Sequence, residues 1–272
     1  MLLINTERAA LLSPLAATVG VVERRHTLPI LSNVLVERKN GALTLLGTDL
    51  ELQIRATVAD ANGGEDFVMT VAARKFYDIV RALPDSATVK LDTKESQVIV
   101  SAGKSRFTLQ TLPAADFPRM ETGSGVGDTV TLPQRALKRL LQLVQFAMAS
   151  QDIRYYLNGM LLVLDGKTLR VVATDGHRLA YAEAELETEV AAREVIVPRK
   201  TVGELVKLLN ETDDAVALAI GANQITVRLD GTELVSKVID GKFPDYQRVI
   251  PQDQPRHLVA NRAAVVAALQ RA

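Results

Sequence analysis

The chain has 272 residues, of which 47% are hydrophobic and 24% are charged, and its basic and acidic residues balance to a formal net charge of zero. These values are those of an ordinary globular protein. A zero net charge excludes an overall basic attraction to nucleic acid, although a local basic face is still compatible with it. The absence of cysteine excludes disulfides, thiolate metal sites and cysteine nucleophiles.

The N-terminal apolar run is short, because Glu7 and Arg8 interrupt it and no basic segment precedes it. This pattern does not predict a signal peptide. No stretch of the sequence approaches the roughly 18 uninterrupted apolar residues of a membrane span. We therefore expect a cytoplasmic protein.

The first half of the chain predicts two helices separated and followed by strands. Apolar residues at helical spacing predict a helix over 7–18, with Pro14 expected to kink it or shift its start. Strict alternation over 50–58 predicts a half-buried antiparallel strand. A shorter amphipathic helix is expected over 74–83, where Pro84 ends it. A turn is expected at Asn62-Gly63-Gly64, and three more strands are expected over 88–92, 97–101 and 106–112.

The second half repeats this order. Leu137, Leu140, Leu141 and Val144 form the apolar face of its first helix, and Pro133 suits the first turn. A second helix is expected over 200–209. The expected strands are 159–164, 168–174, 179–184, 215–220, 224–229 and 234–239.

Matching strings in the two halves show that the chain contains a duplication. Thr48-Asp49 recurs as Thr174-Asp175, an offset of 175 − 49 = 126, and Phe117-Pro118 recurs as Phe243-Pro244 at the same offset. A period this long indicates a duplicated domain rather than a solenoid. A third copy is expected to begin at Asn261-Arg262-Ala263, which echoes Gln134-Arg135-Ala136.

The duplication predicts the domain organisation. We expect a first domain over 1–122, a linker over 123–128, a second domain over 129–250 and the start of a truncated third domain over 251–272. The glycine-rich string from Gly123 to Gly127 could also be read as a phosphate-binding loop. That interpretation needs a strand before it and a helix after it in a βαβ unit, and the junction position favours a linker instead.

Two motifs could carry chemistry. Asp175-Gly176-His177-Arg178 could belong to a catalytic triad or a metal site, to a turn between strands, or to a binding surface. No nucleophile elbow or His-x-x-x-His pair accompanies it. Arg154-Tyr155-Tyr156 is either a half-packed loop or a nucleic-acid contact through phosphates and stacking.

Basic residues recur on the corresponding helices of both halves. One helix alone would simply have a solvated charged face, but repetition predicts a continuous basic surface that attracts phosphates without reading sequence. The residues are Arg74, Lys75, Arg81, Arg135, Lys138, Arg139, Arg199, Lys200 and Lys207.

Several strings together are similar to those of one family. They include Thr27 to Leu31, Arg74 to Phe76, Ser105 to Phe107, Thr111 to Pro118, Arg154 to Gly159, Thr174 to Ala180, Val197 to Lys200 and Phe243 to Tyr246. They resemble the bacterial sliding clamps, the beta subunits of DNA polymerase III. The resemblance implies an α+β fold of tandem duplicated clamp domains, each with two helices packed on antiparallel sheets and the helices on the inner, DNA-facing side.

The resemblance also implies sites and partners. It implies a head-to-tail homodimer ring around duplex DNA, a processivity role without catalysis or cofactor, and binding of polymerases, clamp loader and repair proteins through short peptides. DNA contacts are expected at Arg25, Arg74, Gln151, Tyr155, Tyr156, Arg199 and Lys200. The peptide pocket is expected at Leu157, Thr174, Gly176, His177, Arg178, Leu179, Pro244, Arg248 and Val249, and the first-domain side of the dimer interface at Lys75, Lys104, Arg106 and Leu109.

Three functions are therefore compared. The first is a sequence-independent DNA tether, for which Arg74→Ala and Arg199→Ala are each expected to lower the salt dependence of binding. The second is a peptide-binding module that, in a truncated chain, does not close a ring. The third is an enzyme that uses Asp175 and His177, for which the sequence offers no third catalytic partner.

Overall fold

The computed structural model describes residues 2–23, 28–59, 65–94, 96–121 and 126–272. The chain divides into two compact units, Met1–Gly241 and Lys242–Ala272, which are described separately. Arg25, the Asn62-Gly63-Gly64 turn and the first part of the expected linker lie outside the described residues.

The first copy contains two helices and two groups of strands. Helix α1 (Arg8–Val19) packs on α2 (Ala73–Ala82), and both bury apolar residues that match the predicted stripes. One sheet has the order β1-β6-β7-β8, formed by β1 (Leu2–Glu7), β6 (Thr88–Lys94), β7 (Gln97–Ala102) and β8 (Ser105–Gln110). The other strands are β2 (Asn33–Lys39), β3 (Ala42–Thr48), β4 (Leu52–Val58) and β5 (Phe67–Ala72).

The second copy repeats this arrangement around α3 (Gln134–Val144) and α4 (Arg199–Leu208), which pack on each other. Its long strands β10 (Gly159–Thr174) and β11 (Leu179–Pro198) pair with each other. Its remaining strands are β9 (Val126–Pro133), β12 (Ala215–Gly221), β13 (Gln224–Leu229) and β14 (Thr232–Lys237).

A single eight-stranded sheet joins the two copies, in the order β5-β2-β3-β4-β14-β13-β12-β9. At the seam, β4 pairs antiparallel with β14 from Thr232↔Ala56 to Ser236↔Leu52. Leu52 and Ile54 of β4 are buried in the core of the second copy. The seam therefore contains both ladder hydrogen bonds and a shared apolar core, and it buries two sheet edges that would otherwise be exposed.

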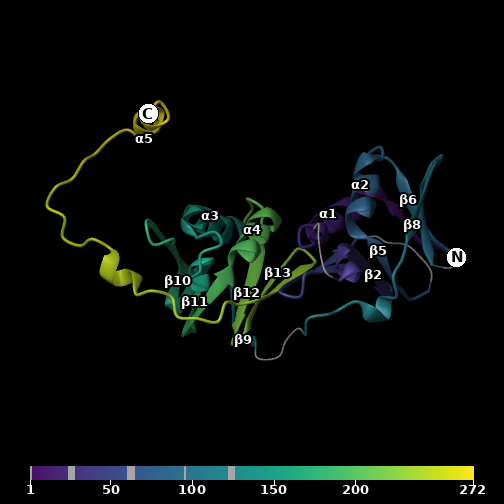
Figure 1. Ribbon diagram of the computed structural model, residues 1–272, viewed down its shortest axis with the longest axis horizontal. Coiled ribbons are helices and arrows are strands. Elements are labelled where there is room, and N and C mark those ends of the chain that lie inside the picture. Colours follow the sequence, from purple (N-terminus) through teal and green to yellow (C-terminus); the bar gives the residue numbers. More distant parts are fainter. Residues whose placement is uncertain (1, 24–27, 60–64, 95, 122–125) are drawn as a thin grey trace. The chain divides into compact units, whose positions relative to one another are not determined.

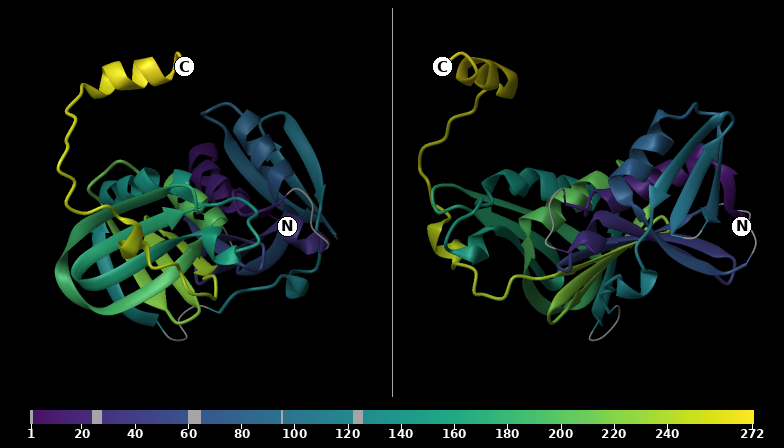
Figure 2. Two further views of the ribbon diagram at one scale, coloured as in Figure 1. Left: turned by 60° about the vertical axis from the view of Figure 1, so that its left-hand side comes forward. Right: turned by 45° about the vertical axis from the view of Figure 1, so that its right-hand side comes forward.

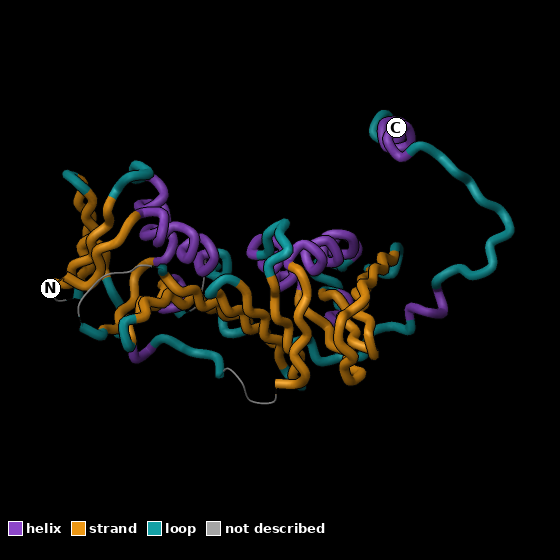
Figure 3. The backbone as a smooth tube through the Cα atoms, turned by 180° about the vertical axis from the view of Figure 1, so that it is seen from behind, coloured by secondary structure: helices purple, strands orange, loops and turns teal. Residues whose placement is uncertain are grey.

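Helices α1, α2, α3 and α4 lie along the same side of this sheet (Figures 1 and 3). Figure 2 shows the same separation of helices and strands from two further directions. No helix of the described residues is both long enough and apolar enough to cross a bilayer. The described residues also contain no group of three His, Asp or Glu side chains that could hold a metal ion.

The second unit contains a short 3-10 turn at Tyr246–Val249 and helix α5 (Arg262–Leu269). Asn261 caps α5, because its side chain accepts a hydrogen bond from Ala264 N at 3.1 Å. The side chains of α5 are exposed, including Val265, Val266 and Leu269. The sequence echo at Asn261-Arg262-Ala263 thus coincides with the start of a helix, as its counterpart Gln134-Arg135-Ala136 does at α3.

The structure corrects several expected elements. The chain forms strands β1, β2, β3, β5 and β9, which the sequence patterns did not predict. Helix α1 contains Pro14 and begins at Arg8, one residue after the expected start. The expected strands 159–164 and 168–174 are two arms of β10. Five extended residues would span roughly 16 Å, yet Arg170 Nη1 lies 3.3 Å from Asp165 Oδ2, so the chain turns back near Gly166, whose φ is +58°.

Strand β11 also continues to Pro198, well beyond the expected end at 184. The glutamates of β11 explain why the sequence predicts a strand that is too short. Every second residue from 183 to 189 is an exposed glutamate, and charged residues are depleted in strands. The intervening residues Ala182, Ala184 and Leu186 face the core of the second copy, so burial on that face holds the strand.

Candidate nucleic-acid and peptide interface

The loop over residues 148–158 follows helix α3 and carries Gln151, Tyr155 and Tyr156. Gln151 has φ +59°, which marks a tight turn. Asn158 closes the loop, since its Oδ1 accepts from Asp152 N at 2.9 Å and its Nδ2 donates to Asp152 O at 2.9 Å. Tyr155 is 58% exposed and packs edge-on against Tyr156, with ring centroids 5.9 Å apart. An exposed aromatic of this kind can stack on a base or a sugar.

An ion pair within this loop positions Arg154. Asp152 Oδ1 accepts from Arg154 Nε at 3.0 Å and Oδ2 accepts from Nη2 at 2.8 Å, a bidentate arrangement. These hydrogen bonds lower the pKa of Asp152 to about 2. Arg154 Nη2 also donates to the carbonyl oxygen of Asp175 at 3.3 Å. Arg154 therefore links the loop to the turn between β10 and β11.

That turn is built by Thr174 and Asp175. Thr174 Oγ1 donates to Arg178 O at 2.7 Å and accepts from Gly176 N at 3.0 Å. Asp175 Oδ1 accepts from the backbone nitrogens of His177 (2.9 Å) and Arg178 (3.0 Å), and these bonds lower the pKa of Asp175. Gly176 has φ +89°, and a Cβ there would lie 3.2 Å from the guanidinium of Arg154. Glycine is therefore favoured by both the backbone and the neighbouring arginine.

The side chains around the turn form an open, mixed surface. His177 and Arg178 are exposed, Leu157 in the loop over 148–158 is buried, and the guanidinium carbon of Arg178 lies 5.5 Å from the centroid of Phe146. In the described part of the chain, the hydrogen bond between Asp175 and His177 uses the backbone nitrogen and not the imidazole. This geometry differs from the Asp–His contact of a catalytic triad.

The first copy has the same turn at Thr48 and Asp49. Leu50 N donates to Thr48 Oγ1 at 3.1 Å, and Asp49 Oδ1 accepts from two backbone nitrogens, as in the second copy. The difference is at Asp49 Oδ2, which lies 2.5 Å from Lys200 Nζ on α4. Lys200 Nζ also donates to Val21 O at 3.0 Å and to Glu23 Oε1 at 2.8 Å. Lys200 thus ties the second copy to the first.

The basic helix faces are partly neutralised. Ion pairs join Arg135 to Asp213 (2.7 Å), Lys138 to Glu211 (4.0 Å), Lys207 to Glu204 (2.7 Å) and Arg81 to Asp78 (3.1 Å). Arg74 and Arg199 donate instead to backbone carbonyls, and neither makes an ion pair with a described residue. The side chains of Lys75 and Arg139 make no hydrogen bond or ion pair with another described residue. Within the described part of the chain, the predicted continuous basic surface is therefore reduced to four cations without a carboxylate partner: Arg74, Lys75, Arg139 and Arg199.

The outer edge of β8 is open within the described residues. Lys104 lies in the turn before β8, and Arg106 and Phe107 are exposed along the strand, whereas Leu109 is buried in the first core. By the offset of 126, β8 corresponds to β14, since 232 − 126 = 106 and 237 − 126 = 111. The edge of β14 is the one that pairs with β4.

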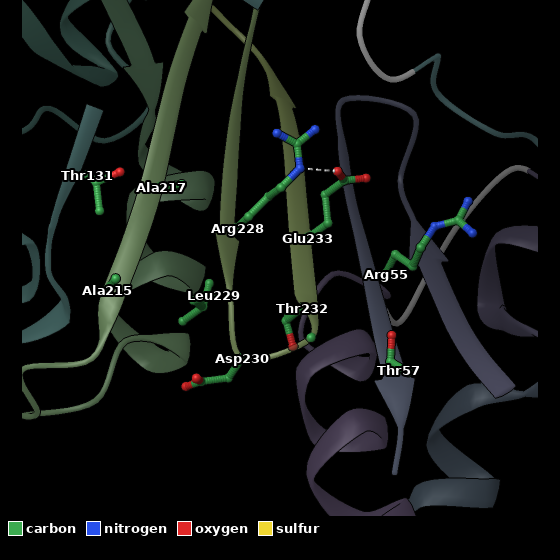
Figure 4. A pocket seen from close by; sticks show the side chains of 11 residues that line it. Arg55, Thr57, Thr131, Ala215, Ala217, Arg228, Leu229, Asp230, Thr232 and Glu233 are labelled. Carbon is green, nitrogen blue, oxygen red and sulfur yellow. Dashed lines mark hydrogen bonds and ion pairs between the residues drawn. The ribbon is translucent and has the colours of Figure 1, made fainter. Parts of the chain in front are cut away.

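A hollow of about 620 Å³ lies over the seam, on the sheet face away from the helices (Figure 4). The ladder register places Arg55, Glu233 and Arg228 in one row across β4, β14 and β13, with Arg228 Nε 2.7 Å from Glu233 Oε2. Alternating charge in this row favours the observed register, because opposite charges face each other across strands.

Comparison with known proteins agrees with this architecture. The model of the N-terminal domain of the DNA polymerase III beta subunit matches residues 2–121, and that of the central domain matches residues 131–245. The chain is 45% identical over 256 residues to the beta sliding clamp of Salmonella typhimurium, a match that covers 94% of this chain and 70% of the relative. The chain belongs to the beta sliding clamp family.

Other clamps give the same result. The beta sliding clamp of Pseudomonas aeruginosa is 46% identical over 266 residues, which cover 97% of this chain and 72% of the relative. A crystal structure of the Pseudomonas aeruginosa clamp bound to griselimycin superposes with a TM-score of 0.94 at 44% identity, covering 99% of this chain and 73% of that one. A clamp structure from Caulobacter crescentus gives 0.91 at 38% identity, covering 100% and 74%. The predicted clamp fold is thereby confirmed, and the chain is a DNA sliding clamp of the replicative polymerase.

In this clamp chain, the first unit brings together part of the predicted peptide pocket. Leu157, Thr174, Gly176, His177, Arg178 and Leu179 belong to the loop and turn described above. Pro244, Arg248 and Val249 belong to the second unit, where Arg248 Nε lies 2.7 Å from Asp245 Oδ2 and Val249 is 65% exposed.

Sequence reasoning missed the residues that hold these surfaces in place. Asp152 and Asn158 order the loop, and the carboxylates of Asp49 and Glu23 accept hydrogen bonds from Lys200. Arg154 was noticed only as part of an aromatic cluster. The Thr-Asp repeat was visible as a motif, but its carboxylate contacts depend on packing between segments far apart in the sequence.

Proposed function

We propose that this clamp chain forms part of a ring around duplex DNA and acts without catalysis as a tether for replication proteins. The observation that carries the proposal is the seam between β4 and β14. One clamp domain already joins the next through these edges, and the equivalent edge of β8 is unpaired within the described residues. A β4-like strand of a second molecule would complete it head to tail, with Lys75, Lys104, Arg106 and Leu109 at or behind that contact.

The helix side is proposed to face DNA. Arg74, Gln151, Tyr155 and Arg199 are exposed on α2, α4 and the loop after α3, and Lys200 and Tyr156 lie beside them. Arg25 completes the proposed set from sequence alone. Outward charge on β11 supports the orientation, because a row of exposed glutamates repels a phosphate backbone. Contacts to phosphate and stacking on sugars carry no base information, so binding is expected to be independent of sequence.

The peptide partners are proposed to bind at the turn between β10 and β11. Leu157 supplies an apolar floor, while Thr174, Gly176, His177, Arg178 and Leu179 surround it with polar groups and backbone. An apolar anchor with a few orienting polar groups is the usual arrangement of such sites. We assign Pro244, Arg248 and Val249 to the same function from the family resemblance.

Two titrations test these assignments. Fluorescence anisotropy with two labelled duplexes of unrelated sequence should give equal affinities that fall with salt, and affinities that differ tenfold between sequences would exclude a sliding mode. A labelled peptide containing glutamine and leucine should bind wild type, and Leu157→Ala or Pro244→Ala should weaken it. Unchanged peptide affinity in both variants would remove the pocket assignment. Turnover of esters or nucleotides that disappears in His177→Ala would instead support the enzyme alternative.

A further inference from the structure

Two arginines of the proposed DNA-binding set make the same unusual contact in the two copies. In the first copy, Arg74 Nη2 donates to the carbonyl oxygen of Val22 at 2.7 Å. In the second copy, Arg199 Nη1 donates to the carbonyl oxygen of Met148 at 2.8 Å and to that of Ala149 at 3.3 Å. The acceptors are separated by 148 − 22 = 126 residues and the donors by 199 − 74 = 125 residues. Each arginine lies at the start of its copy's second helix, and each acceptor lies where the chain leaves the first.

The contact in the second copy closes the loop at both ends. The backbone nitrogen of Arg199 donates to Asn158 O at 3.0 Å, so one residue holds the beginning of the loop with its side chain and the end with its backbone. Between these points, Ala149 N donates to Leu157 O at 3.0 Å. Loop residues 150–157 include Gln151 and Tyr155 on the proposed DNA side and Leu157 in the proposed peptide floor.

Carbonyl acceptors explain why arginine suits this position. A guanidinium is planar and always charged, and its fork of donors can hold two oxygens at once. The carbonyl oxygens of Met148 and Ala149 follow the 3-10 turn Gln145–Ala147 after α3, and Arg199 Nη1 donates to both. An ammonium group has no fixed fork, and an alanine would leave the carbonyls of Met148 and Ala149 without this donor.

We propose that Arg74 and Arg199 are positioning residues, which hold the chain at Val22 after α1 and at Met148 and Ala149 after α3, and act on DNA through these segments rather than as direct phosphate ligands. The proposal rests on the DNA-binding function proposed above and refines it. It reverses the simplest expectation for a basic residue on this face, namely that its removal lowers the salt dependence of binding. The loop of the second copy also reaches the peptide turn through Arg154, so loss of Arg199 should weaken both kinds of binding.

Hydrogen exchange and DNA titration on the 272-residue chain test the proposal, using Arg199→Ala, Arg199→Lys and the matched control Arg139→Ala. Arg139 is exposed on α3 and touches no part of the loop through a hydrogen bond or ion pair in the described structure. Amides of residues 149–158 should exchange about tenfold to a hundredfold faster in Arg199→Ala, the range set by loss of a hydrogen bond to a charged group. In Arg139→Ala they should exchange as in wild type. Amides of β12 report global stability, so their exchange shows how much of the change in the loop comes from destabilisation of the whole unit.

The salt dependence separates positioning from direct contact. A lost phosphate contact reduces the slope of log affinity against log salt by about one. We expect Arg199→Ala to bind more weakly with the wild-type slope, and Arg199→Lys to keep that slope while its loop still exchanges faster than wild type.

Wild-type exchange rates in the loop of Arg199→Ala or Arg199→Lys, or a slope lowered by about one in Arg199→Ala, would overturn the proposal. If wild type shows no salt-dependent binding of duplex, the proposed DNA function fails. The exchange rates of residues 149–158 then test the positioning role without the DNA titration. If Arg199→Ala does not fold, Arg199→Lys provides these exchange rates.

Discussion

Replacing Lys200 by methionine should lower the free energy of unfolding by more than the loss of an ordinary surface ion pair would. The ammonium group of Lys200 binds Asp49, Glu23 and the carbonyl of Val21, all from the first copy. The side chain of Asp49 is only 7% exposed, so Lys200→Met leaves its carboxylate buried without this cation. Methionine is one heavy atom shorter than lysine but keeps a flexible apolar stem, and therefore changes little besides the charge.

The magnitude follows from burial. Breaking a fully buried pair costs about 3–5 kcal/mol. Lys200 itself is 34% exposed, and Asp49 keeps its bonds to two backbone nitrogens, so solvent screening reduces the cost to about 2 kcal/mol. Lys237→Met is the matched control, because Lys237 pairs with Glu51 at the same seam while the two side chains are 51% and 68% exposed. Its removal should cost about 0.5 kcal/mol or less.

Urea denaturation of wild type and both variants measures these differences. Adding Asp49→Asn to Lys200→Met should recover part of the loss, because the stranded charge is removed. Equal costs for Lys200→Met and Lys237→Met would refute the argument that burial of Asp49 makes the Lys200 connection strong.

The difference in unfolding free energy between wild type and Lys200→Met should also depend on pH, in a direction set by the pKa of Lys200. Burial opposes the charge on Lys200, but the hydrogen bonds that Lys200 donates to Asp49 and Glu23 outweigh it, and its pKa is raised above the usual 10.5. A raised pKa in the folded state means that the stabilisation is fully present below 10.5 and is lost as pH rises through the folded value. The gap in unfolding free energy between wild type and Lys200→Met should therefore be constant from pH 7 to 9 and narrow above 10.5.

Further predictions concern backbone packing, the loop and the open edge. Gly47→Ala should destabilise the chain by about 2 kcal/mol in thermal or urea unfolding, because the added Cβ would lie 2.6 Å from the backbone oxygen of Thr18. The Cβ added by Gly203→Ala on α4 meets nothing within 4 Å, so this variant should be about 0.5–1 kcal/mol more stable than wild type. A Gly203→Ala variant less stable than Gly47→Ala would contradict the packing described. Carboxyl NMR should show Asp152 titrating near pH 2. The ion pair between Asp152 and Arg154 should then be fully formed above pH 3.8 and lost as pH falls through about 2. Titration of Asp152 near pH 4 would show that this ion pair is absent in solution. Arg106→Glu should weaken any self-association measured by sedimentation without changing unfolding free energy, whereas a change in stability alone would place Arg106 outside a contact between molecules.

The sequence predicted the helices well because their apolar stripes have a clear period and their ends have clear signals. The helices over 74–83 and 200–209 each differ from α2 and α4 by a single residue at either end. Strands β2 and β3 were missed because both are buried along most of their length, so they lack the alternation that reveals a half-buried strand. The glutamates of β11 concealed a strand that burial of its other face stabilises.

The candidate site was predictable as a set of residues but not as a set of contacts. Thr174, Asp175 and Arg199 stand in repeated motifs, which family resemblance translates into roles. The acceptors of Arg74 and Arg199 are backbone carbonyls 52 and about 50 residues away, and a carbonyl leaves no trace in residue identity. For the same reason, the sequence counted Lys200 as a free cation although two carboxylates of the first copy compensate it.

The central claim is that duplex DNA lies against the helix side of the first unit and not against its strand side. Hydrogen exchange of the chain with and without a 30-base-pair duplex, at about 50 mM salt, tests this directly. We expect slower exchange in α2, in α4 and in residues 149–158, with no change over residues 183–189 of β11. Protection over the glutamate-bearing part of β11, with the helices and the loop unaffected, would contradict the account.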